Sequence, residues 1–254
     1  MAKHIVVFDS GIGGTSVLEH IQNQIPHAKL SYLMDNKYLP YGELSFEFLT
    51  QRITSLLSHF ITLIEPVDLL IIACNTASTQ TLDILRQHFN FPIVGVVPAI
   101  KPAAEKTLSK KIGVLATPAT VANEYTASLV KDFAASCCVS LYGSSKLVKL
   151  AEQKFWTNDL DSKQLEQELS TLYIDKEIDQ LVLGCTHFPI IAEEIKRYIN
   201  PQTTLLDSGE AIANRVVSLL GESVITLDNK KQPVSYFATA AFKQTKLPIT
   251  VITN

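Results

Sequence analysis

Short runs of apolar, often β-branched residues recur along the chain and alternate with segments in which apolar residues follow a helical period. This alternation is typical of parallel strands joined by crossover helices, and strands that are apolar almost throughout are covered on both faces. We predict strands over residues 4–8, 30–34, 69–73, 93–97, 112–116, 139–142, 181–184 and 204–206. The pattern therefore predicts an α/β fold built on mostly parallel sheets.

The clearest helical pattern lies at residues 45–64, and Pro66 follows its end. Its apolar positions on a near-helical period are Phe46, Leu49, Ile53, Leu56, Leu57, Phe60 and Leu63. Residues 211–220 predict a further amphipathic helix, and we assign no other element within residues 221–254.

The chain also repeats itself at about half its length. Residues 68–76, with the sequence DLLIIACNT, align with residues 179–187, with the sequence DQLVLGCTH. Residues 4–10 have a fainter counterpart in residues 111–117. We therefore expect two similar domains related by pseudo-twofold symmetry, each a mostly parallel sheet flanked by helices. The first would comprise residues 1–97 and 208–254, and the second residues 98–207.

The amino-acid composition argues against nucleic acids and membranes as binding partners. The 254 residues are 46% hydrophobic, which is enough to build cores for two domains of ordinary size. Because 22 Lys and Arg face 25 Asp and Glu without runs of either sign, we expect no nucleic-acid partner. The first nine residues reach an Asp too early for a signal peptide, and no apolar stretch approaches membrane-spanning length. Four cysteines without framework spacing indicate free thiols, so we predict a cytoplasmic protein without membrane contact.

Two of the cysteines occupy equivalent places in the repeat. Cys74 and Cys185 each follow a central strand and immediately precede a helix, where open α/β sheets bind ligands. A single cysteine at such a position is more often a small buried apolar residue, but two cysteines at matching positions of a repeat favour a catalytic role. We expect helix N–H groups and a nearby acid or base to lower the pKa of such thiols.

A symmetric pair of thiols suits inversion of a carbon centre. One thiolate removes a proton from one face, and the opposite thiol returns a proton to the other face. A carbon next to a carboxylate is a weak acid, so the site must also stabilise developing negative charge. Polar groups that could do so flank both cysteines, namely Asp9, Ser10, Asn75, Thr76, Thr117, Thr120, Thr186 and His187. We predict cofactor-independent racemisation or epimerisation of a small acidic metabolite.

Six motifs in order then point to a known family. They are FDSGIGG at residues 8–14, PYGE at 40–43, ACNTAST at 73–79, GVVPAI at 95–100, GCTHFP at 184–189 and DSG at 207–209. In these motifs the chain resembles the bacterial glutamate racemases from Val7 to about Val216. The resemblance implies interconversion of L- and D-glutamate without pyridoxal phosphate or metal, supplying D-glutamate for peptidoglycan. It also implies two similar α/β domains facing each other across the site, and a homodimer.

The same resemblance implies a role for each site residue. Cys74 would remove the proton from the D isomer and Cys185 from the L isomer, assisted by Asp9 and His187, with Glu152 as a third assisting group. The substrate-binding residues implied by the family are Asp9, Ser10, Pro40, Tyr41, Gly42, Cys74, Asn75, Thr76, Thr117, Thr120, Cys185, Thr186 and His187.

Two features depart from the family pattern. Members regulated by a peptidoglycan precursor tend to carry extra residues before the first strand, whereas Asp9 lies near the start here, so we expect no such activation. In addition, Pro118 and Ala119 stand between Thr117 and Thr120. Because proline has no N–H, this loop offers one backbone donor fewer.

Other interpretations of the motifs carry less weight. The glycines of residues 11–14 could form a phosphate loop, but Ser16 stands at the sixth position of the dinucleotide fingerprint, and no P-loop lysine follows. Cys74, Cys185 and His187 could bind zinc, but the sequence has no second closely spaced ligand pair, so we expect no metal. Adjacent Cys137 and Cys138 would form a strained disulfide, and we expect both to be buried.

Three alternative functions stay open at this point. The nearest is an aspartate racemase or another racemase that works without pyridoxal phosphate, because spacing alone does not measure the substrate's chain length. A second is a two-lobed binding protein whose cysteines belong to the core and whose cleft captures an acidic ligand. A third is a thiol redox enzyme.

Overall fold

The computed structural model describes residues 2–221, 230–243 and 245–253. Its strands are β1 (His4–Asp9), β2 (Lys29–Met34), β3 (Leu69–Ile72), β4 (Ile93–Gly95), β5 (Lys111–Ala116), β6 (Cys138–Gly143), β7 (Gln180–Leu183), β8 (Thr204–Leu206), β9 (Val234–Ala238) and β10 (Ile249–Val251). The longer helices are α1 (Thr15–Gln24), α2 (Phe46–Leu63), α3 (Asn75–His88), α6 (Glu124–Phe133), α7 (Lys146–Thr157), α8 (Ser162–Thr171) and α10 (Gly209–Leu220). Shorter ones are α4 (Ile100–Lys106), α5 (Pro118–Val121), α9 (Ala192–Tyr198) and the 3₁₀ turns η1 (Asn36–Tyr38), η2 (Tyr41–Glu43) and η3 (Phe188–Ile191).

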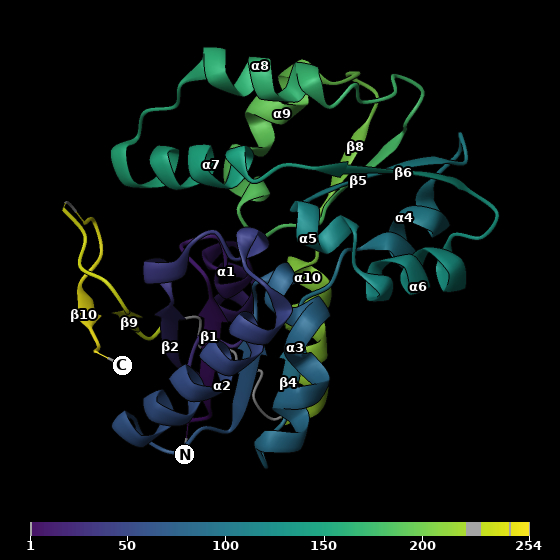
Figure 1. Cartoon of the computed structure of the whole chain (residues 1–254). Coiled ribbons are helices and arrows are strands. Elements are labelled where there is room, and N and C mark those ends of the chain that lie inside the picture. Colours follow the sequence, from purple (N-terminus) through teal and green to yellow (C-terminus); the bar gives the residue numbers. More distant parts are fainter. Residues whose placement is uncertain (1, 222–229, 244, 254) are drawn as a thin grey trace.

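The strands form two parallel sheets in separate halves of the molecule (Figure 1). The first has the order β10-β9-β2-β1-β3-β4 and the second the order β6-β5-β7-β8. The run β2-β1-β3-β4 corresponds strand by strand to β6-β5-β7-β8, as the sequence repeat predicts. The predicted strands are all present within two residues at each end, and the α/β class with two mostly parallel sheets is confirmed.

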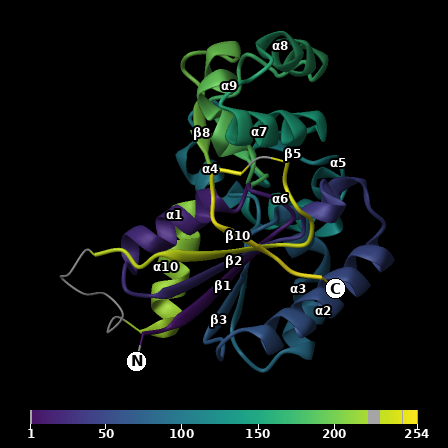
Figure 2. The same cartoon turned by 90° about the vertical axis from the view of Figure 1, so that its left-hand side faces the viewer.

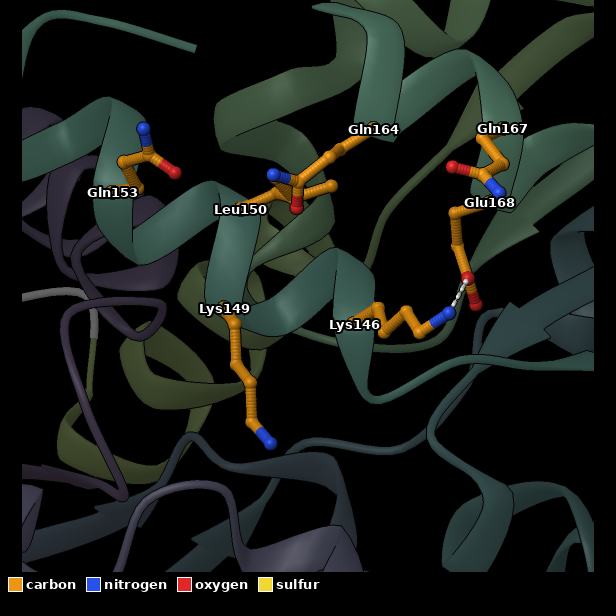
Figure 3. Close-up of a pocket in the computed structure, with 7 residues that line it drawn as sticks. All are labelled: Lys146, Lys149, Leu150, Gln153, Gln164, Gln167 and Glu168. Atoms are coloured by element: carbon orange, nitrogen blue, oxygen red, sulfur yellow. Dashed lines mark ion pairs between the residues drawn. The ribbon is translucent and has the colours of Figure 1, made fainter. Parts of the chain in front are cut away.

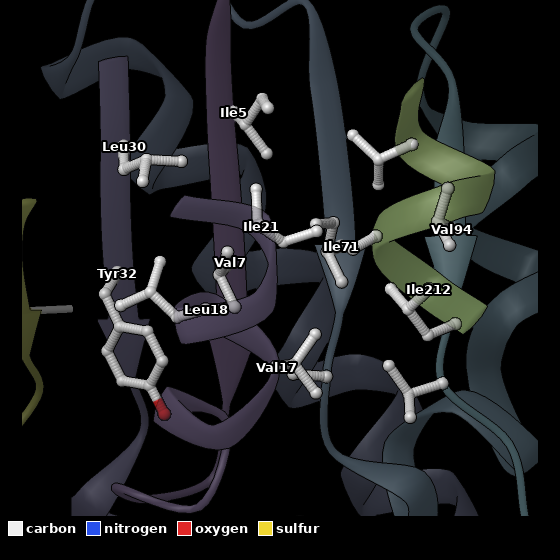
Figure 4. Packing of buried hydrophobic residues seen from close by; sticks show 14 of the residues in the cluster. Ile5, Val7, Val17, Leu18, Ile21, Leu30, Tyr32, Ile71, Val94 and Ile212 are labelled. Atoms are coloured by element: carbon white, nitrogen blue, oxygen red, sulfur yellow. The ribbon is translucent and has the colours of Figure 1, made fainter. Parts of the chain in front are cut away.

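Both faces of each sheet are covered, because successive side chains of a strand point to opposite faces. In β1, Ile5 and Val7 pack with α1 and α10 in one core (Figure 4), whereas Val6 and Phe8 pack with α2 and α3 in another. The second sheet divides in the same way between a core with α7 and a core with α4. Burial on both faces explains why these strands read as continuous apolar runs.

Helix α2 begins where its pattern predicts. The Ser45 side chain accepts a hydrogen bond from the backbone N–H of Phe48 at 3.3 Å and so caps the first turn. Leu49, Ile53, Leu56, Leu57 and Phe60 are fully buried against the sheet. Phe46 and Leu63, at the two ends of the pattern, are instead 47% and 53% exposed.

The chain returns to the first sheet after β8. Helix α10 packs against α1, and β9 pairs with β2 while β10 pairs with β9 (Figure 2). The sequence pattern had identified α10 but neither of these strands. On this basis we propose two domains, residues 1–97 with 208–254 and residues 98–207. Residues 1, 222–229, 244 and 254 of the first domain lie outside the described part.

Within the described ranges, every helix is too short or too polar to cross a membrane.

Candidate functional site

The carboxyl ends of the two sheets meet and bring the predicted site residues together. Asp9 ends β1, Cys74 follows β3 as the N-cap of α3, and Cys185 follows β7. The Thr186 hydroxyl donates a hydrogen bond to Oδ2 of Asp9 at 2.9 Å, which joins the two halves directly. The site is therefore formed by both repeats, at the sheet edge where parallel sheets bind ligands.

The Cys74 thiol lies in a buried environment beside Ser10 and Asp9. Its Sγ is 3.8 Å from Oγ of Ser10, and that hydroxyl is 3.4 Å from Oδ1 of Asp9. Burial raises the pKa of Cys74, the negative charge on Asp9 raises it further, and the backbone N–H of Ala77 opposes them. The expectation that this thiol has a lowered pKa is wrong, because desolvation outweighs the helix N-terminus.

Asp9 is a buried carboxylate held by several donors. Its Oδ1 accepts from the backbone N–H of Gly11 at 3.0 Å, and its Oδ2 accepts from Thr186. Burial raises the pKa of Asp9, although positive charge on His187 and these hydrogen bonds oppose the rise. A carboxylate with a raised pKa next to a thiol is suited to take a proton from it.

Cys185 has a different acid/base partner. Its Sγ is 3.9 Å from Nδ1 of His187, and Nε2 of His187 lies 2.8 Å from Oε1 of Glu152. Burial opposes charge on His187, but hydrogen bonds to Cys185 and Glu152 raise its pKa well above the usual value. Burial also opposes charge on Glu152, yet the hydrogen bond from His187 leaves the pKa of that carboxyl lowered. His187 lies between Cys185 and Glu152, and these two contacts favour its imidazolium form.

The glycine-rich turn after β1 lets the two halves approach closely. A Cβ at Gly11 would collide with Oε1 of Glu152, and one at Gly13 would collide with the His187 ring. The backbone N–H of Ile12 donates to Glu152 Oε1 at 2.7 Å. These glycines therefore make room for the Glu152–His187 pair, which explains the turn without a bound phosphate.

Three threonine hydroxyls form a second cluster across the two repeats. Oγ1 of Thr76 lies 2.8 Å from Oγ1 of Thr117 and 3.2 Å from Oγ1 of Thr120. Thr117 caps α5, and Pro118 occupies the first turn, where its missing N–H removes no helical hydrogen bond. Asn75 follows Cys74 and donates from Nδ2 to the carbonyl of Val96 at 3.4 Å.

The segment with Pro40, Tyr41 and Gly42 also reaches the site. A Cβ at Gly42 would lie 2.8 Å from Cβ of Thr117, so this backbone passes directly against the threonine cluster. The Tyr41 hydroxyl, however, donates to Oδ2 of Asp35 at 2.7 Å. Asp35 is fully buried and also accepts two hydrogen bonds from the Arg52 guanidinium. Tyr41 is therefore anchored through its side chain, and its backbone is the part available at the site.

Small hollows accompany the cluster. A cavity of about 10 Å³ is lined by residues of both halves, among them Asn75, Cys185, Thr186, Asp207 and Ser208. A separate surface hollow between α7 and α8 holds none of the predicted site residues (Figure 3). The two lysines of that hollow are paired, Lys146 with Glu168 at 3.2 Å and Lys149 with Glu43 at 3.0 Å.

The remaining cysteines lie elsewhere. Cys137 is only half-buried and Cys138 is exposed, so the expectation that both are buried is wrong. The reason is that Cys138 begins β6, an edge strand of the second sheet. Across the part of the chain that the structure describes, no three His, Cys, Asp or Glu side chains converge as metal ligands would.

Sequence reasoning missed several residues that support the site. Asp35 and Arg52 hold Tyr41, and Trp156 Nε1 donates to Oε2 of Glu152 at 2.8 Å. Ser16 donates from Oγ to the Thr186 carbonyl at 3.2 Å across the two halves. Trp156 could have been found, because it lies four residues after Glu152 on one helix face. The other contacts come from tertiary packing, which leaves no local pattern.

Comparisons with known proteins agree with this geometry. The family model described as Asp/Glu/Hydantoin racemase matches residues 11–216. The chain is 49% identical over 223 residues to a glutamate racemase of Shewanella sp. (strain MR-7), covering 88% of this chain and 81% of that protein.

Two solved structures extend the comparison. Glutamate racemase of Escherichia coli, in complex with L-glutamate and the activator UDP-MurNAc-ala, superposes with a TM-score of 0.87 at 40% identity, covering 96% of this chain and 91% of that one. Glutamate racemase of Francisella tularensis, in complex with D-glutamate, gives a TM-score of 0.78 at 25% identity, covering 99% and 97% of the two chains.

Proposed function

The chain belongs to the Asp/Glu/Hydantoin racemase family, and we propose that it is an isomerase that interconverts L- and D-glutamate by two-thiol proton transfer. The observation that carries the proposal is the placement of Cys74 and Cys185 at equivalent strand ends, each with its own acid/base partner. Glutamate as the substrate rests on the relatives, which are glutamate racemases at 49% identity.

In the proposed reaction each thiol alternates between base and acid. The Cys185 thiolate takes the Cα proton of L-glutamate, and the Cys74 thiol gives its proton to the opposite face, which yields D-glutamate. In the reverse direction the Cys74 thiolate takes the proton and Cys185 returns one. In each turnover one cysteine gains a proton and the other loses one, and no electrons are transferred. The reaction therefore needs neither an oxidant nor a reductant.

The two cysteines have neighbours of opposite charge. The His187 imidazolium, 3.9 Å from the Cys185 sulfur, stabilises negative charge on that sulfur. Cys74 instead lies beside Asp9, which accepts the thiol proton by way of the Ser10 hydroxyl. Because burial raises the pKa of Cys74, its thiol favours the protonated form and is ready to serve as the acid.

Polar groups around the cysteines supply the binding contacts in this proposal. The threonine cluster of Thr76, Thr117 and Thr120, together with Asn75 and Thr186, provides donors for the two substrate carboxylates. The backbone of Pro40, Tyr41 and Gly42 adds contacts from the facing loop, and Ser10 and Asp9 lie where the substrate ammonium would be held. These donors stabilise the charge that develops when Cα loses its proton.

Optical activity tests this function and its nearest alternative together. We expect purified protein, dialysed against a chelator and given no pyridoxal phosphate, to bring either isomer of glutamate to zero rotation. Aspartate should react at least about 10²-fold more slowly, since a site built to pair both carboxylates discriminates by chain length. Faster loss of rotation with aspartate would assign that substrate instead. Unchanged rotation with folded protein that binds glutamate would favour a binding protein.

The expected assembly is a homodimer. Phe46 and Phe48 both belong to the first turn of α2 and have 47% and 40% of their surfaces exposed, and such exposed aromatic side chains support an apolar contact with a second copy. We expect sedimentation velocity to give twice the 28.0 kDa mass of the chain, and Phe46→Glu to shift it toward one chain. A single-chain mass for the unaltered protein at micromolar concentration would contradict the dimer.

In the cell the enzyme would supply D-glutamate for peptidoglycan from the cytoplasm. The four free cysteines suit a reducing compartment, which supports this location. Cell fractionation should place the protein with the cytoplasmic fraction, and recovery with the envelope would argue against it.

A further inference from the structure

Trp156 makes a contact that the proposed reaction does not explain. It lies on α7 one turn after Glu152, and its indole N–H donates to Oε2 of Glu152 at 2.8 Å. The other carboxylate oxygen, Oε1, accepts from the backbone N–H of Ile12 and pairs with His187 Nε2. Both oxygens of one largely buried carboxylate are therefore occupied, and the indole is the partner found for Oε2.

The indole is itself held in place from two sides. Phe155 packs against it edge-on with ring centroids 5.0 Å apart, and Phe242 packs against it at 4.4 Å. Phe242 follows β9 in the sequence, so the C-terminal part of the first sheet reaches α7 in the second half of the molecule. The nearer ring, that of Phe242, holds the plane of the indole, and the hydrogen bond to Glu152 sets the direction of its N–H.

We propose that Trp156 is a positioning residue for proton transfer at Cys185, an inference that rests on the proposed function. The indole N–H fixes the rotation of the Glu152 carboxylate, so that Oε1 points at His187 and the imidazole ring stays directed at the Cys185 sulfur. Without this donor, Oε2 would be left unsatisfied in a site where only 13% of the Glu152 side chain is exposed. The carboxylate would then turn toward other donors, and His187 would lose its alignment.

Charge supports the same role. The hydrogen bond from Trp156 is one of the contacts that lower the pKa of Glu152 and keep it ionised despite burial. An ionised Glu152 in turn favours the imidazolium form of His187. The hydrogen bonds of Asp9 and Cys74 go to other groups, and the charges of His187 and Glu152 act on Asp9 with opposite signs, so that they partly cancel there. The effect of Trp156 should therefore fall on one half of the reaction.

A probe with a leaving group separates the two halves. A thiolate first removes the proton from Cα of 3-chloroglutamate. The electrons of the broken C–H bond then form a double bond between Cα and Cβ, and chloride leaves with the electrons of the C–Cl bond. The enamine tautomerises to an imine, and water hydrolyses it to 2-oxoglutarate and ammonium. Since no proton is returned by the opposite thiol, the L-configured probe reports on Cys185 and the D-configured probe on Cys74.

The test compares Trp156→Phe with Phe155→Leu. The first keeps an aromatic ring against Phe242 but loses the N–H, and the second alters packing on the indole while leaving the N–H in place. We expect Trp156→Phe to lower 2-oxoglutarate formation from the L-configured probe about tenfold and from the D-configured probe less than twofold. Phe155→Leu should leave both rates within twofold. In a Glu152→Gln background, Trp156→Phe should cause no further loss.

Each outcome decides for or against the positioning role. Equal losses with both probes, or unchanged rates in Trp156→Phe with an unfolding temperature like that of the unaltered protein, would overturn it. If Trp156→Phe fails to fold, 5-fluorotryptophan in place of tryptophan gives the same comparison, because a fluorinated indole has an N–H of altered acidity. The replacement should change the rate with the L-configured probe in the unaltered protein. It should leave that rate unchanged in the Glu152→Gln protein. Failure of the unaltered protein to racemise glutamate would instead overturn the proposed function.

Discussion

Serine in place of either Cys74 or Cys185 should lower racemisation of glutamate at least about 10³-fold, the largest effect expected of any single substitution in the site. An alcohol is a far weaker acid than a thiol, so the serine neither holds an anion beside the substrate nor returns a proton readily. Both cysteines are buried and small, so serine fits without disturbing the packing. Steady-state loss of optical rotation measures the effect.

The two variants can be told apart even though both lose racemisation. L- and D-glutamate have equal free energies, so any variant must lower kcat/KM equally in the two directions. Elimination from 3-chloroglutamate avoids this constraint. Cys185→Ser should lose elimination from the L-configured probe and retain it from the D-configured probe, and Cys74→Ser should do the reverse. The matched control is Cys138→Ser, an exposed cysteine on β6, which should stay within twofold. Equal tolerance at all three cysteines would contradict the assignment.

The substitution Asp9→Asn should lower kcat about 10²-fold, and KM should rise as well, because the neutral amide holds the substrate ammonium less strongly than the carboxylate does. The amide would keep the shape of the side chain and its hydrogen bonds to Gly11 and Thr186, because the threonine hydroxyl can turn to accept. It cannot take the proton that Cys74 must release before acting as a base. Elimination from the D-configured probe should therefore fall with kcat, and elimination from the L-configured probe should stay within threefold.

The control for Asp9→Asn is Asp68→Asn. Asp68 lies at the opposite end of the sheet, where it accepts from the backbone N–H of His4 and pairs with Lys3. This variant also removes one carboxylate but should leave both elimination rates within twofold. Full activity in Asp9→Asn, or an equal loss with both probes, would show that Asp9 does not serve the Cys74 side.

Much of the fold could be predicted because strands buried on both faces leave a strong local signal. The runs at β1 and β3 are apolar at nearly every position of both faces, and the repeat around Cys74 and Cys185 placed the two thiols at matching strand ends. Strands β9 and β10 were missed because β10 forms the edge of the sheet and β9 lies beside it, and exposed positions such as Ser235 interrupt the apolar run. The pairing of β9 with β2 and of β10 with β9 is set by tertiary contacts, not by the sequence of these strands.

The site was predicted as a set of residues but not as a network. Thr186 and Asp9 are 177 positions apart, and no sequence period shows that they share a hydrogen bond. The protonation of Cys74 was also misjudged, because a helix N-terminus is visible in the sequence whereas the desolvation around a sulfur is not. The family resemblance named Asp9, His187 and Glu152 as assisting groups, and the structure adds the contacts that place Asp9 beside Cys74 by way of Ser10 and His187 between Cys185 and Glu152.

Isotope incorporation in D2O tests the central claim, inversion by two opposed thiols, most directly. When chelator-treated protein acts on L-glutamate in D2O and the reaction is stopped within the first few per cent of conversion, D-glutamate should carry deuterium at Cα while the remaining L-glutamate stays protonated. The reason is that the thiol donating to the product has already exchanged with solvent, whereas the thiol accepting from the substrate has not returned its proton. D-Glutamate that retains the original hydrogen, or deuterium appearing equally in both isomers from the start, would contradict the account.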